Sequence, residues 1–330
     1  MKDLDFLAIG DITTDAFIRI KDAKVHCEIN REKCQLCMDF ATKIPYESVT
    51  VVPAVGNSPN AAVAAARLGL KSGLYTNMGD DENGKDCLAS LKKNRVDTDH
   101  VSVHAGHKTN YHYVLWYGDE RTILIKHEKY DYKLPFLGIP KWIYLSSMGE
   151  SGAGIHDDLA KYLDDRKEIK LAFQPGTFQI SLGYERLKKI YERTSVFFCN
   201  VEEAKKILKT EESNISRLSA KLKELGPEMV VITDGKKGAY LLYEKELFFM
   251  PPYPDPSPPY ERTGAGDAFS STFTAALAIG KTPFEAIAWA PINGMSVVQK
   301  IGAQEGLLSR KELEKLLKAA PENYKPEIVV

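Results

Sequence analysis

The chain has 330 residues, of which 44% are hydrophobic and 27% are charged, and its formal net charge is −1. This length is sufficient for a large core in one α/β domain or in two smaller ones. A charge near zero gives no electrostatic basis for binding nucleic acid or an anionic membrane, and no apolar run approaches the roughly 20 residues of a transmembrane helix. The N-terminus has no basic-then-apolar signal pattern, so we expect a soluble cytoplasmic protein without nucleic-acid or membrane partners.

The N-terminal region predicts strands around an irregular segment. Residues 5–9 are apolar and indicate a first buried strand, whereas residues 12–20 alternate in the manner of an exposed strand. Residues 21–44 are polar and show no clear period, and residues 49–52 predict a further strand. Because two strands and an irregular segment precede the first helix, this region does not fit a plain βαβ unit. We expect a small β insertion that stands off the main sheet.

The first helix is predicted to follow directly. Ser58 is a suitable N-cap, Pro59 suits the first helical position, and Gly69 is a stop signal. One face of the segment between them is almost entirely alanine, so we expect the helix to pack closely against a sheet.

The rest of the chain alternates between strand and helix patterns. Two alternating segments within residues 109–127, joined at Gly118–Arg121, predict a hairpin. Short apolar runs separated by helical segments predict a mainly parallel sheet, and a late hairpin follows it. The expected strands are residues 72–78, 110–117, 122–127, 142–147, 170–173, 195–199, 229–233, 239–243 and 247–250. Capping boxes at Thr282 and Ser309 predict two further helices.

The chain contains five cysteines, and two hypotheses concern a cluster near the N-terminus. An odd number of cysteines in a long chain without a signal sequence predicts reduced thiols. His26, Cys27, Cys34 and Cys37 are residue types that bind zinc, but their spacing matches no standard set of ligand pairs. We therefore favour an insertion that carries thiols over a zinc site.

The segment Glu261–Phe269 joins small residues to the start of a predicted helix. The backbone at Gly264, Ala265 and Gly266 can approach a ligand closely, and its N–H groups, with the positive end of the helix dipole, would bind anionic oxygens. Asp267 then lies in the first helical turn, where a carboxylate repels a neighbouring anion. A general base that takes a proton from an attacking hydroxyl would explain this placement, and an ordinary acidic helix start would explain it equally well.

Two further polar segments follow predicted strands. Asn200 and Glu203 stand at the carboxyl end of a strand, where α/β sheets bind ligands, although an Asn N-cap with acidic first-turn residues is the commoner explanation. Thr233, Gly235 and Gly238 form a glycine-rich turn, which by itself is a weak signal because such turns commonly join strands.

The residues Thr-Gly-Ala-Gly-Asp at 263–267, followed by Ala-Phe, resemble the C-terminal signature of the ribokinase-like (PfkB) carbohydrate and nucleoside kinases. In that family the Asp, here Asp267, is the catalytic base, and the Gly-Ala-Gly amides form an anion hole. The resemblance implies a kinase that uses ATP and Mg²⁺. Glu261 stands where the family usually has Asp, and Arg262 where Thr is common, so a K⁺ site at this place is an open expectation.

The other motifs occur in the order of that family over nearly the whole chain, with Val55 in place of the first glycine of a Gly-Gly-x-x-x-Asn segment. The resemblance implies that the substrate contacts Asp15, Gly56 and Asn60, and that Asn200 and Glu203 hold Mg²⁺ through water. It implies that the nucleotide contacts Thr233, Gly235, Gly238, Thr263, Asn293 and Gly302.

From these features we expect a single catalytic domain over residues 1–330. Its fold would be a three-layer α/β/α sandwich with a mostly parallel central sheet, and residues near 12–54 and 109–127 would form a small β lid. We expect this lid to join two chains in a homodimer, as in relatives with such lids.

The expected activity is transfer of the γ-phosphoryl group of ATP to a hydroxyl of a small sugar. A nucleoside is the alternative substrate, because several aromatic side chains offer faces for a base: Tyr111, Tyr113, Trp116, Tyr117 and the nearby Phe17. A non-catalytic ligand sensor on a kinase fold is the alternative of another class, and the intact Asp267 argues against it.

Overall fold

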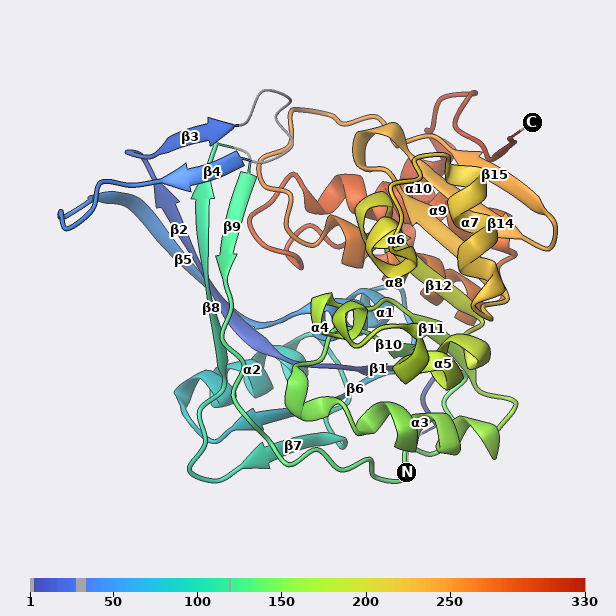
Figure 1. Ribbon diagram of the computed structural model, residues 1–330, viewed down its shortest axis with the longest axis horizontal. Coiled ribbons are helices and arrows are strands. Elements are labelled where there is room, and N and C mark those ends of the chain that lie inside the picture. The colour runs from blue at the N-terminus through green and yellow to red at the C-terminus, as the bar shows by residue number, and fades with distance from the viewer. Residues whose placement is uncertain (1–2, 28–33, 119, 330) are drawn as a thin grey trace.

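The computed structural model describes residues 3–27, 34–118 and 120–329. Within these residues one large sheet has the strand order β16-β15-β14-β13-β12-β11-β10-β1-β6-β7 (Figure 1). Strands β13 to β7 in that order are parallel, and β14, β15 and β16 extend one edge in antiparallel pairing. The bounds are β1 Phe6–Ile9, β6 Ser72–Gly79, β7 Val101–His104, β10 Trp142–Leu145, β11 Lys170–Phe173, β12 Val196–Asn200, β13 Met229–Thr233, β14 Ala239–Tyr243, β15 Glu246–Met250 and β16 Glu327–Ile328.

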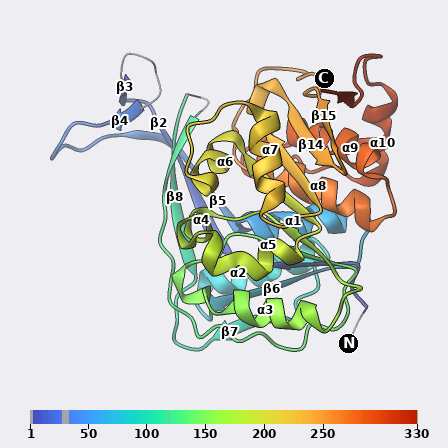
Figure 2. The ribbon, with the colours of Figure 1, turned by 45° about the vertical axis from the view of Figure 1, so that its right-hand side comes forward.

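Helices cover both faces of this sheet, because successive strand residues point to opposite sides. In β1, Phe6 and Ala8 belong to one buried apolar cluster, while Leu7 and Ile9 belong to the other. Figure 2 shows α3, α5 and α7 in front of the sheet. The predicted three-layer α/β/α architecture with a mostly parallel sheet is therefore confirmed. One face carries α1 Asn57–Arg67, α2 Glu82–Lys93, α8 Ala265–Ala278, α9 Pro283–Val297 and α10 Arg310–Lys318, and the other carries α3 Ile155–Asp164, α4 Thr177–Leu182, α5 Tyr184–Arg193, α6 Val201–Leu208 and α7 Ile215–Glu224.

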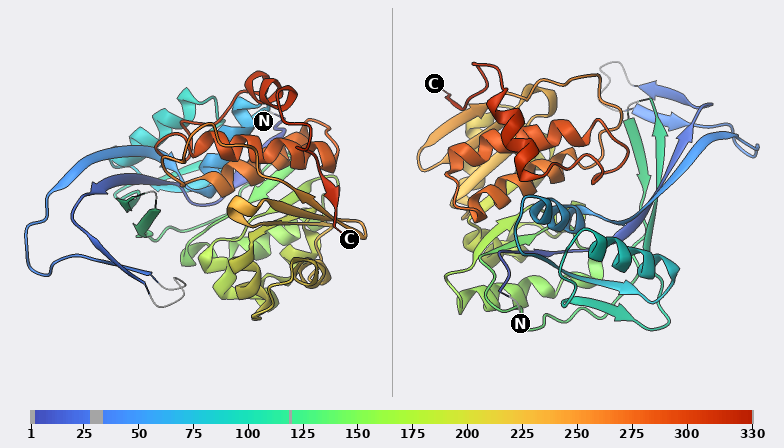
Figure 3. Two further views of the ribbon diagram at one scale, coloured as in Figure 1. Left: turned by 90° about the horizontal axis from the view of Figure 1, so that it is seen from above. Right: turned by 180° about the vertical axis from the view of Figure 1, so that it is seen from behind.

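A second, four-stranded sheet stands away from the main body, as both views of Figure 3 show. We call this sheet the lid. Its order is β5-β2-β8-β9, formed by Tyr46–Val55, Thr13–Ile20, Asn110–Tyr117 and Glu120–Leu124. The central strand β2 pairs antiparallel with β5 and parallel with β8. The two segments that were expected to form the lid therefore lie side by side, and Asp119, in the predicted turn between β8 and β9, lies outside the described residues.

The prediction that residues 12–20 form an exposed strand is wrong. Thr13 to Phe17 are buried, because β2 has a partner strand on each side and continues directly from β1 in the body. The alternation of polar and apolar side chains in this strand reflects its two faces. Asp15 lies on the face toward the body of the protein. Ala16 lies on the opposite face, where its cross-strand neighbours Val51 and Tyr113 cover it.

The first helix begins two residues earlier than predicted. Gly56, with φ of 118°, is its N-cap, and Ser58 lies inside the helix with its hydroxyl 2.5 Å from the hydroxyl of Ser146. A positive φ of this kind favours glycine, so the turn at Gly56 sets the helix start. The capping boxes at Thr282 and Ser309 are confirmed at the starts of α9 and α10. In the part of the chain that the structure describes, no helix is both long and apolar enough to cross a bilayer.

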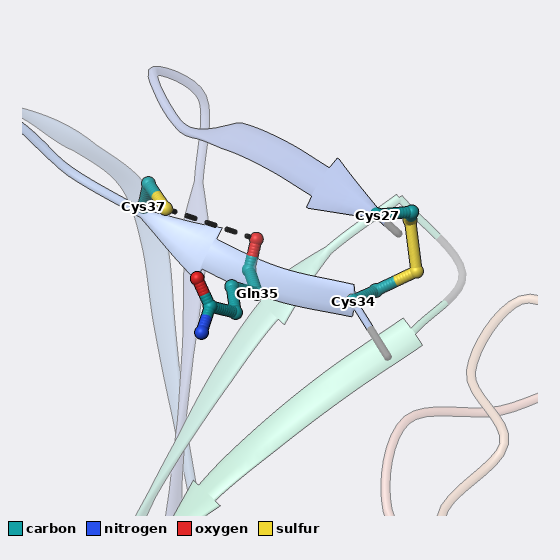
Figure 4. Close-up of a disulfide and its surroundings, with 4 residues drawn as sticks. All are labelled: Cys27, Cys34, Gln35 and Cys37. Atoms are coloured by element: carbon teal, nitrogen blue, oxygen red, sulfur yellow. Dashed lines mark hydrogen bonds between the residues drawn. A yellow bond between two sulfur atoms is a disulfide. The ribbon is translucent and has the colours of Figure 1, made fainter. Parts of the chain in front are cut away.

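The prediction of reduced thiols fails at two cysteines. Cys27 and Cys34 face each other across the short antiparallel strands β3 Lys24–Cys27 and β4 Cys34–Cys37, and they form a disulfide (Figure 4). The cysteine count does not predict this pair, and the sequence of residues 21–44 predicts an irregular polar segment. Residues 28–33 lie outside the described part. The described residues contain no group of three or more metal-binding side chains, and Cys37 Sγ instead donates to the carbonyl oxygen of Gln35.

Candidate active site

A cavity of about 820 Å³ opens between the lid and the carboxyl ends of the parallel strands. Ligands of open α/β sheets bind at this edge, because several strands end there side by side. Asp11 follows β1, Gln174 follows β11, and the ends of β12 and β13 supply Asn200 and Thr233. The lining includes most of the residues predicted for the site: Asp15, Gly56, Asn60, Asn200, Glu203, Thr233, Thr263, Gly264, Gly266 and Asp267.

The N-terminus of α8 forms one wall of this cavity. Gly264 is the N-cap and adopts a left-handed conformation with φ of 82°, and the helix begins at Ala265. A Cβ atom at Gly264 would lie 2.3 Å from the Cβ atom of Ala303, so only glycine fits there without a shift of the backbone. The first N–H groups of a helix have no acceptor within it, and they carry the positive end of the helix dipole. This wall can therefore bind an anion, as the sequence predicted.

Asp267, in the first turn of α8, is held by three neutral amide groups. Asn57 Nδ2 donates to Oδ1 at 2.8 Å, and Asn60 Nδ2 donates to Oδ2 at 2.8 Å. Gln174 Nε2 donates to Oδ1 at 3.3 Å. Among the described residues no cationic group forms a direct ion pair with this carboxylate. Such an ion pair would lower its pKa and make it a weaker base.

Further hydrogen bonds fix which end of two of these amides faces Asp267. Gln304 Nε2 donates to Asn60 Oδ1 at 2.9 Å, so the nitrogen of Asn60 must face the carboxylate. Gln174 Oε1 accepts from the hydroxyls of Tyr144 and Ser270, which directs the nitrogen of Gln174 the same way. The sequence analysis did not identify Asn57, Gln174 or Gln304, because a single amide side chain leaves no pattern in the sequence.

Burial raises the pKa of the Asp267 carboxyl above its usual value, and the hydrogen bonds from Asn60, Asn57 and Gln174 oppose this rise. The positive charge of Arg121 on the lid also lowers it, but less. The result is a carboxylate with more affinity for a proton than an exposed Asp. This is the property expected of a general base at the position of an attacking hydroxyl.

The lid side of the cavity contains two histidine–carboxylate pairs. His127 Nδ1 lies 2.9 Å from Asp11 Oδ2, and the hydrogen bond to Asp11 raises the pKa of His127. His112 Nδ1 lies 3.4 Å from Asp15 Oδ1, and Asp15 is only 7% exposed. Among the described residues, Asp15 Oδ1 and His112 Nε2 have no hydrogen-bond partner. Asp15 Oδ1 can accept a hydrogen bond from a polyhydroxy ligand, and His112 Nε2 can donate one. Of these four residues, only Asp15 was predicted to bind the substrate.

Asn200 and Glu203 form a capping box at the start of α6. Asn200 Oδ1 accepts from Glu203 N at 2.8 Å, and Glu203 Oε2 accepts from Asn200 N at 2.9 Å. The commoner structural explanation is therefore correct for these atoms. Both residues also line the cavity, and the pKa of Glu203 is raised by burial and further by the charge of Asp267. The capping box uses Oε2 of Glu203, so the second carboxylate oxygen at this edge of the cavity can hold the water shell of a divalent cation such as Mg²⁺.

Residues 26–310 match the model of the pfkB family carbohydrate kinases. The chain belongs to this family. Ribokinase of Bacillus subtilis (strain 168) is 32% identical over 270 residues, which cover 79% of this chain and 87% of that protein. The 5-dehydro-2-deoxygluconokinase of the same organism is 26% identical over 305 residues, covering 83% and 89% of the two chains. The protein is therefore a sugar kinase of the pfkB family, a phosphotransferase that acts on a sugar hydroxyl.

The solved structure of Arabidopsis thaliana ribokinase complexed with ribose and ATP has the same fold. It superposes with a TM-score of 0.77 at 20% identity and covers 96% of this chain and 99% of that chain. The small separate sheet that the pfkB resemblance predicted is thus a part of the shared fold.

Five residues that the pfkB resemblance assigned to the site do not line the cavity of the described structure. Asn293 is fully buried, where it donates to Thr272 Oγ1 at 2.8 Å and accepts from Leu308 N at 2.9 Å, and so ties α8 and α9 to the following loop. Gly302 lies beneath the lid beside Phe17 and Val52. The others are Ala265, Gly235 and Gly238, the last two of which lie in the turn between β13 and β14.

Proposed function

We propose that this pfkB kinase transfers the γ-phosphoryl group of ATP to a hydroxyl of a small sugar, with Asp267 as the general base. The observation that carries the proposal is the Asp267 carboxylate, fixed by neutral amides beside the N-terminus of α8. The sugar oxygen forms a bond to phosphorus while its proton passes to an Asp267 oxygen. The bond from phosphorus to the ADP oxygen breaks, and the electron pair remains on ADP.

The residues around Asp267 would divide the remaining work. The first amides of α8, from Gly264 to Gly266, would stabilise the negative charge on the phosphoryl oxygens. Asn200 and Glu203 would hold Mg²⁺ through water, and Thr233 and Thr263 would adjoin the nucleotide phosphates. Mg²⁺ supplies charge compensation to the phosphates when it is bound. Because the protein consumes ATP in this scheme, we place its activity in the cytoplasm.

The acceptor would bind between the lid and Asp267. Asp15 is proposed to accept hydrogen bonds from sugar hydroxyls, and Gly56 is proposed to contact the sugar with its backbone, because it lines the cavity at the start of α1. Asn60 already uses its amide oxygen for Gln304 and its nitrogen for Asp267, so its proposed contribution is to position the base. Relatives named ribokinase and 5-dehydro-2-deoxygluconokinase support a pentose or a sugar acid of similar size.

A sugar is favoured over a nucleoside by the orientation of the lid aromatics. Tyr113 pairs across the strands with Ala16 and Leu124, so it shares the face of the lid opposite to that of Asp15 and His112. Tyr111 lies on this same face, and Trp116 packs against Tyr260. None of these three rings, and neither Phe17 nor Tyr117, lines the cavity in the described structure, so the expected stacking of a base lacks support.

The residues at Glu261 do not fit a monovalent cation. The Glu261 carboxylate is only 1% exposed, and its Oε1 accepts from Thr263 N at 2.7 Å and from Thr263 Oγ1 at 2.5 Å. Its negative charge is already balanced by Arg121, whose Nε lies 3.8 Å away. We therefore propose no K⁺ at this position and derive no step from one.

The proposed activity predicts sugar-dependent release of ADP. The purified protein with Mg-ATP should turn over at least one compound in a panel of pentoses, hexoses, sugar acids and nucleosides, and NMR of the product should locate a new phosphate ester on a sugar hydroxyl. Turnover of nucleosides alone would overturn the sugar assignment. ATP binding without turnover of any compound would contradict the proposed reaction for the acceptors tested.

We also propose that the outer face of the lid joins two chains in a homodimer. Val51, Tyr113 and Leu124 lie in one cross-strand row on this face, and each is about half exposed. An exposed apolar patch of this kind favours association. Sedimentation equilibrium should give twice the mass of one chain, and Val51→Lys with Leu124→Lys should give one chain mass. A wild-type protein that remains monomeric would contradict the proposal.

A further inference from the structure

The loop before α8 contains a buried carboxylate that serves no step of the proposed mechanism. Glu261 is tied to Thr263 through Oε1, whereas its Oε2 is buried and has no hydrogen-bond partner among residues 3–27, 34–118 and 120–329. A buried carboxylate is costly unless a positive charge lies close to it. This residue, three positions before the helix N-cap Gly264, is therefore expected to hold a cation in place.

The nearest cation that the structure shows comes from the lid. Arg121, near the start of β9, places Nε 3.8 Å from Glu261 Oε1, and its side chain is largely buried. Next to this pair, Arg262 Nε lies 3.7 Å from Glu120 Oε1. Two adjacent residues of β9 thus meet two adjacent residues of the loop with opposite charges. These contacts fix where the lid meets the loop that precedes the base.

Arg121 also faces the site of reaction. It lines the cavity together with Gly264, Gly266 and Asp267, and its charge acts on Asp267. Its separation of 3.8 Å from Glu261 is that of an ion pair without a hydrogen bond, and Nε has no hydrogen-bond partner in the described structure. Apart from histidines, the cationic side chains among the described lining residues are Arg121 and Arg262, and Arg262 pairs with Glu120.

We propose that Arg121 is a catalytic residue carried by the lid, whose guanidinium contacts the transferring phosphoryl group while Glu261 holds it in position. This inference rests on the proposed kinase function and adds one residue to it. In phosphoryl transfer, negative charge spreads over the three equatorial oxygens, and an arginine that reaches them stabilises the transition state. No bond to Arg121 forms or breaks, and no proton leaves it. Because Arg121 belongs to β9, the strand that supplies the charge is part of the sheet that covers the cavity.

The test is the substitution Arg121→Gln, assayed with Mg-ATP and the sugar that the wild-type protein phosphorylates. We expect kcat to fall by about 10²–10³-fold, with the KM for the sugar changed by less than about fivefold. The acidic limb of the pH–rate profile should move to higher pH, because Asp267 loses a charge that lowers its pKa. In Arg121→Ala, free guanidinium below denaturing concentrations should restore part of kcat.

Arg19→Gln is the matched control. Arg19 is also a lid arginine, and it donates to the hydroxyl of Tyr260, the residue before Glu261, at 3.2 Å, but it does not line the cavity. Its loss should weaken the contact between lid and loop and leave kcat within about threefold of wild type. An Arg121→Gln protein with kcat in that same range, or with only KM raised, would overturn the proposal and leave Arg121 as a docking residue.

A second variant keeps the test valid if Arg121→Gln fails to fold. That substitution leaves Glu261 buried and uncompensated, which is strongly destabilising. Arg121→Gln combined with Glu261→Gln removes both charges, so the double variant should fold and should still be slow, whereas a fast double variant would overturn the proposal. Wild-type protein with no sugar-dependent ADP release would refute the kinase function itself, and the inference would fall with it. If the wild-type protein is active and Arg121→Gln has an unchanged kcat, the role of Arg121 is refuted but the kinase function is not.

Discussion

Replacing Asp267 with Asn should lower kcat at least about 100-fold, the usual scale of general-base catalysis. The substitution keeps the shape of the side chain but removes the group that accepts the proton. It also turns an NH₂ group toward the amide donors of Asn57, Asn60 and Gln174, so one of their hydrogen bonds is lost. Steady-state assays should show the loss in kcat, while calorimetry should show that ATP still binds.

Asp81→Asn provides the matched control for this substitution. Asp81 is the N-cap of α2 and accepts from Gly84 N at 3.0 Å and from Thr109 N at 3.1 Å, away from the cavity. Asn caps a helix as well as Asp does, so the expected loss is the hydrogen bond from Thr109 N, which should lower the free energy of unfolding by about 0.5–1.5 kcal/mol and leave kcat near the wild-type value. If Asp267→Asn retains more than about a tenth of wild-type turnover, Asp267 is not the general base.

The pH dependence of the wild-type enzyme should report the same carboxylate. The base must be ionised to accept a proton, so the rate should fall as the pH drops through the pKa of Asp267. Because burial raises this pKa, the acidic limb should lie above the pH at which an exposed Asp titrates, about 3.9. Because the folded protein favours the protonated form, the contribution of Asp267 to stability is greatest at acidic pH and falls as the pH rises through its raised pKa.

The parts of the site that lie within one short segment could be predicted from the sequence. The helix start and the acidic residue at 263–267 can be predicted from that segment alone, because glycines at a helix start and an acidic first-turn residue are local features. The amides that hold Asp267 are different, since Asn57 is 210 residues and Gln174 is 93 residues distant in the sequence. Only the fold brings them to one carboxylate, and no spacing rule relates them.

The errors in the fold have a similar physical origin. Alternation of polar and apolar residues in β2 was read as exposure, but polar side chains such as Asp15 face a buried site. The segment with Cys27 and Cys34 lacks an apolar face, because its hairpin stands free of both cores, so periodicity gave no signal for it. The sequence predicts that Arg121 lies in a hairpin turn. It does not predict the contact with Glu261, which is 140 residues away and which the sequence marks only as a difference from the pfkB pattern.

Replacing Gly264 with Ala should both destabilise the protein and abolish most of its activity. The residue has φ of 82°, and a left-handed backbone costs an L-residue about 1–2 kcal/mol. The new Cβ would also lie 2.3 Å from Ala303 Cβ, and overpacking of this kind costs about 1–3 kcal/mol. Chemical denaturation should therefore show a loss of about 2–5 kcal/mol, the sum of these two estimates.

Gly280→Ala separates the cost of the left-handed backbone from the cost of the clash with Ala303. Gly280 follows the other end of α8 with φ of 92°, but a Cβ there would meet nothing within 4 Å, so only the backbone cost of about 1–2 kcal/mol should appear. Its kcat should match wild type. At Gly264 the clash can be relieved only if the start of α8 moves away from Ala303, and a shift of about 1 Å in a catalytic group can cost about 100-fold in rate. A Gly264→Ala protein that is as active as Gly280→Ala would show that the helix N-terminus does not need its present position, and the anion-hole assignment would be wrong.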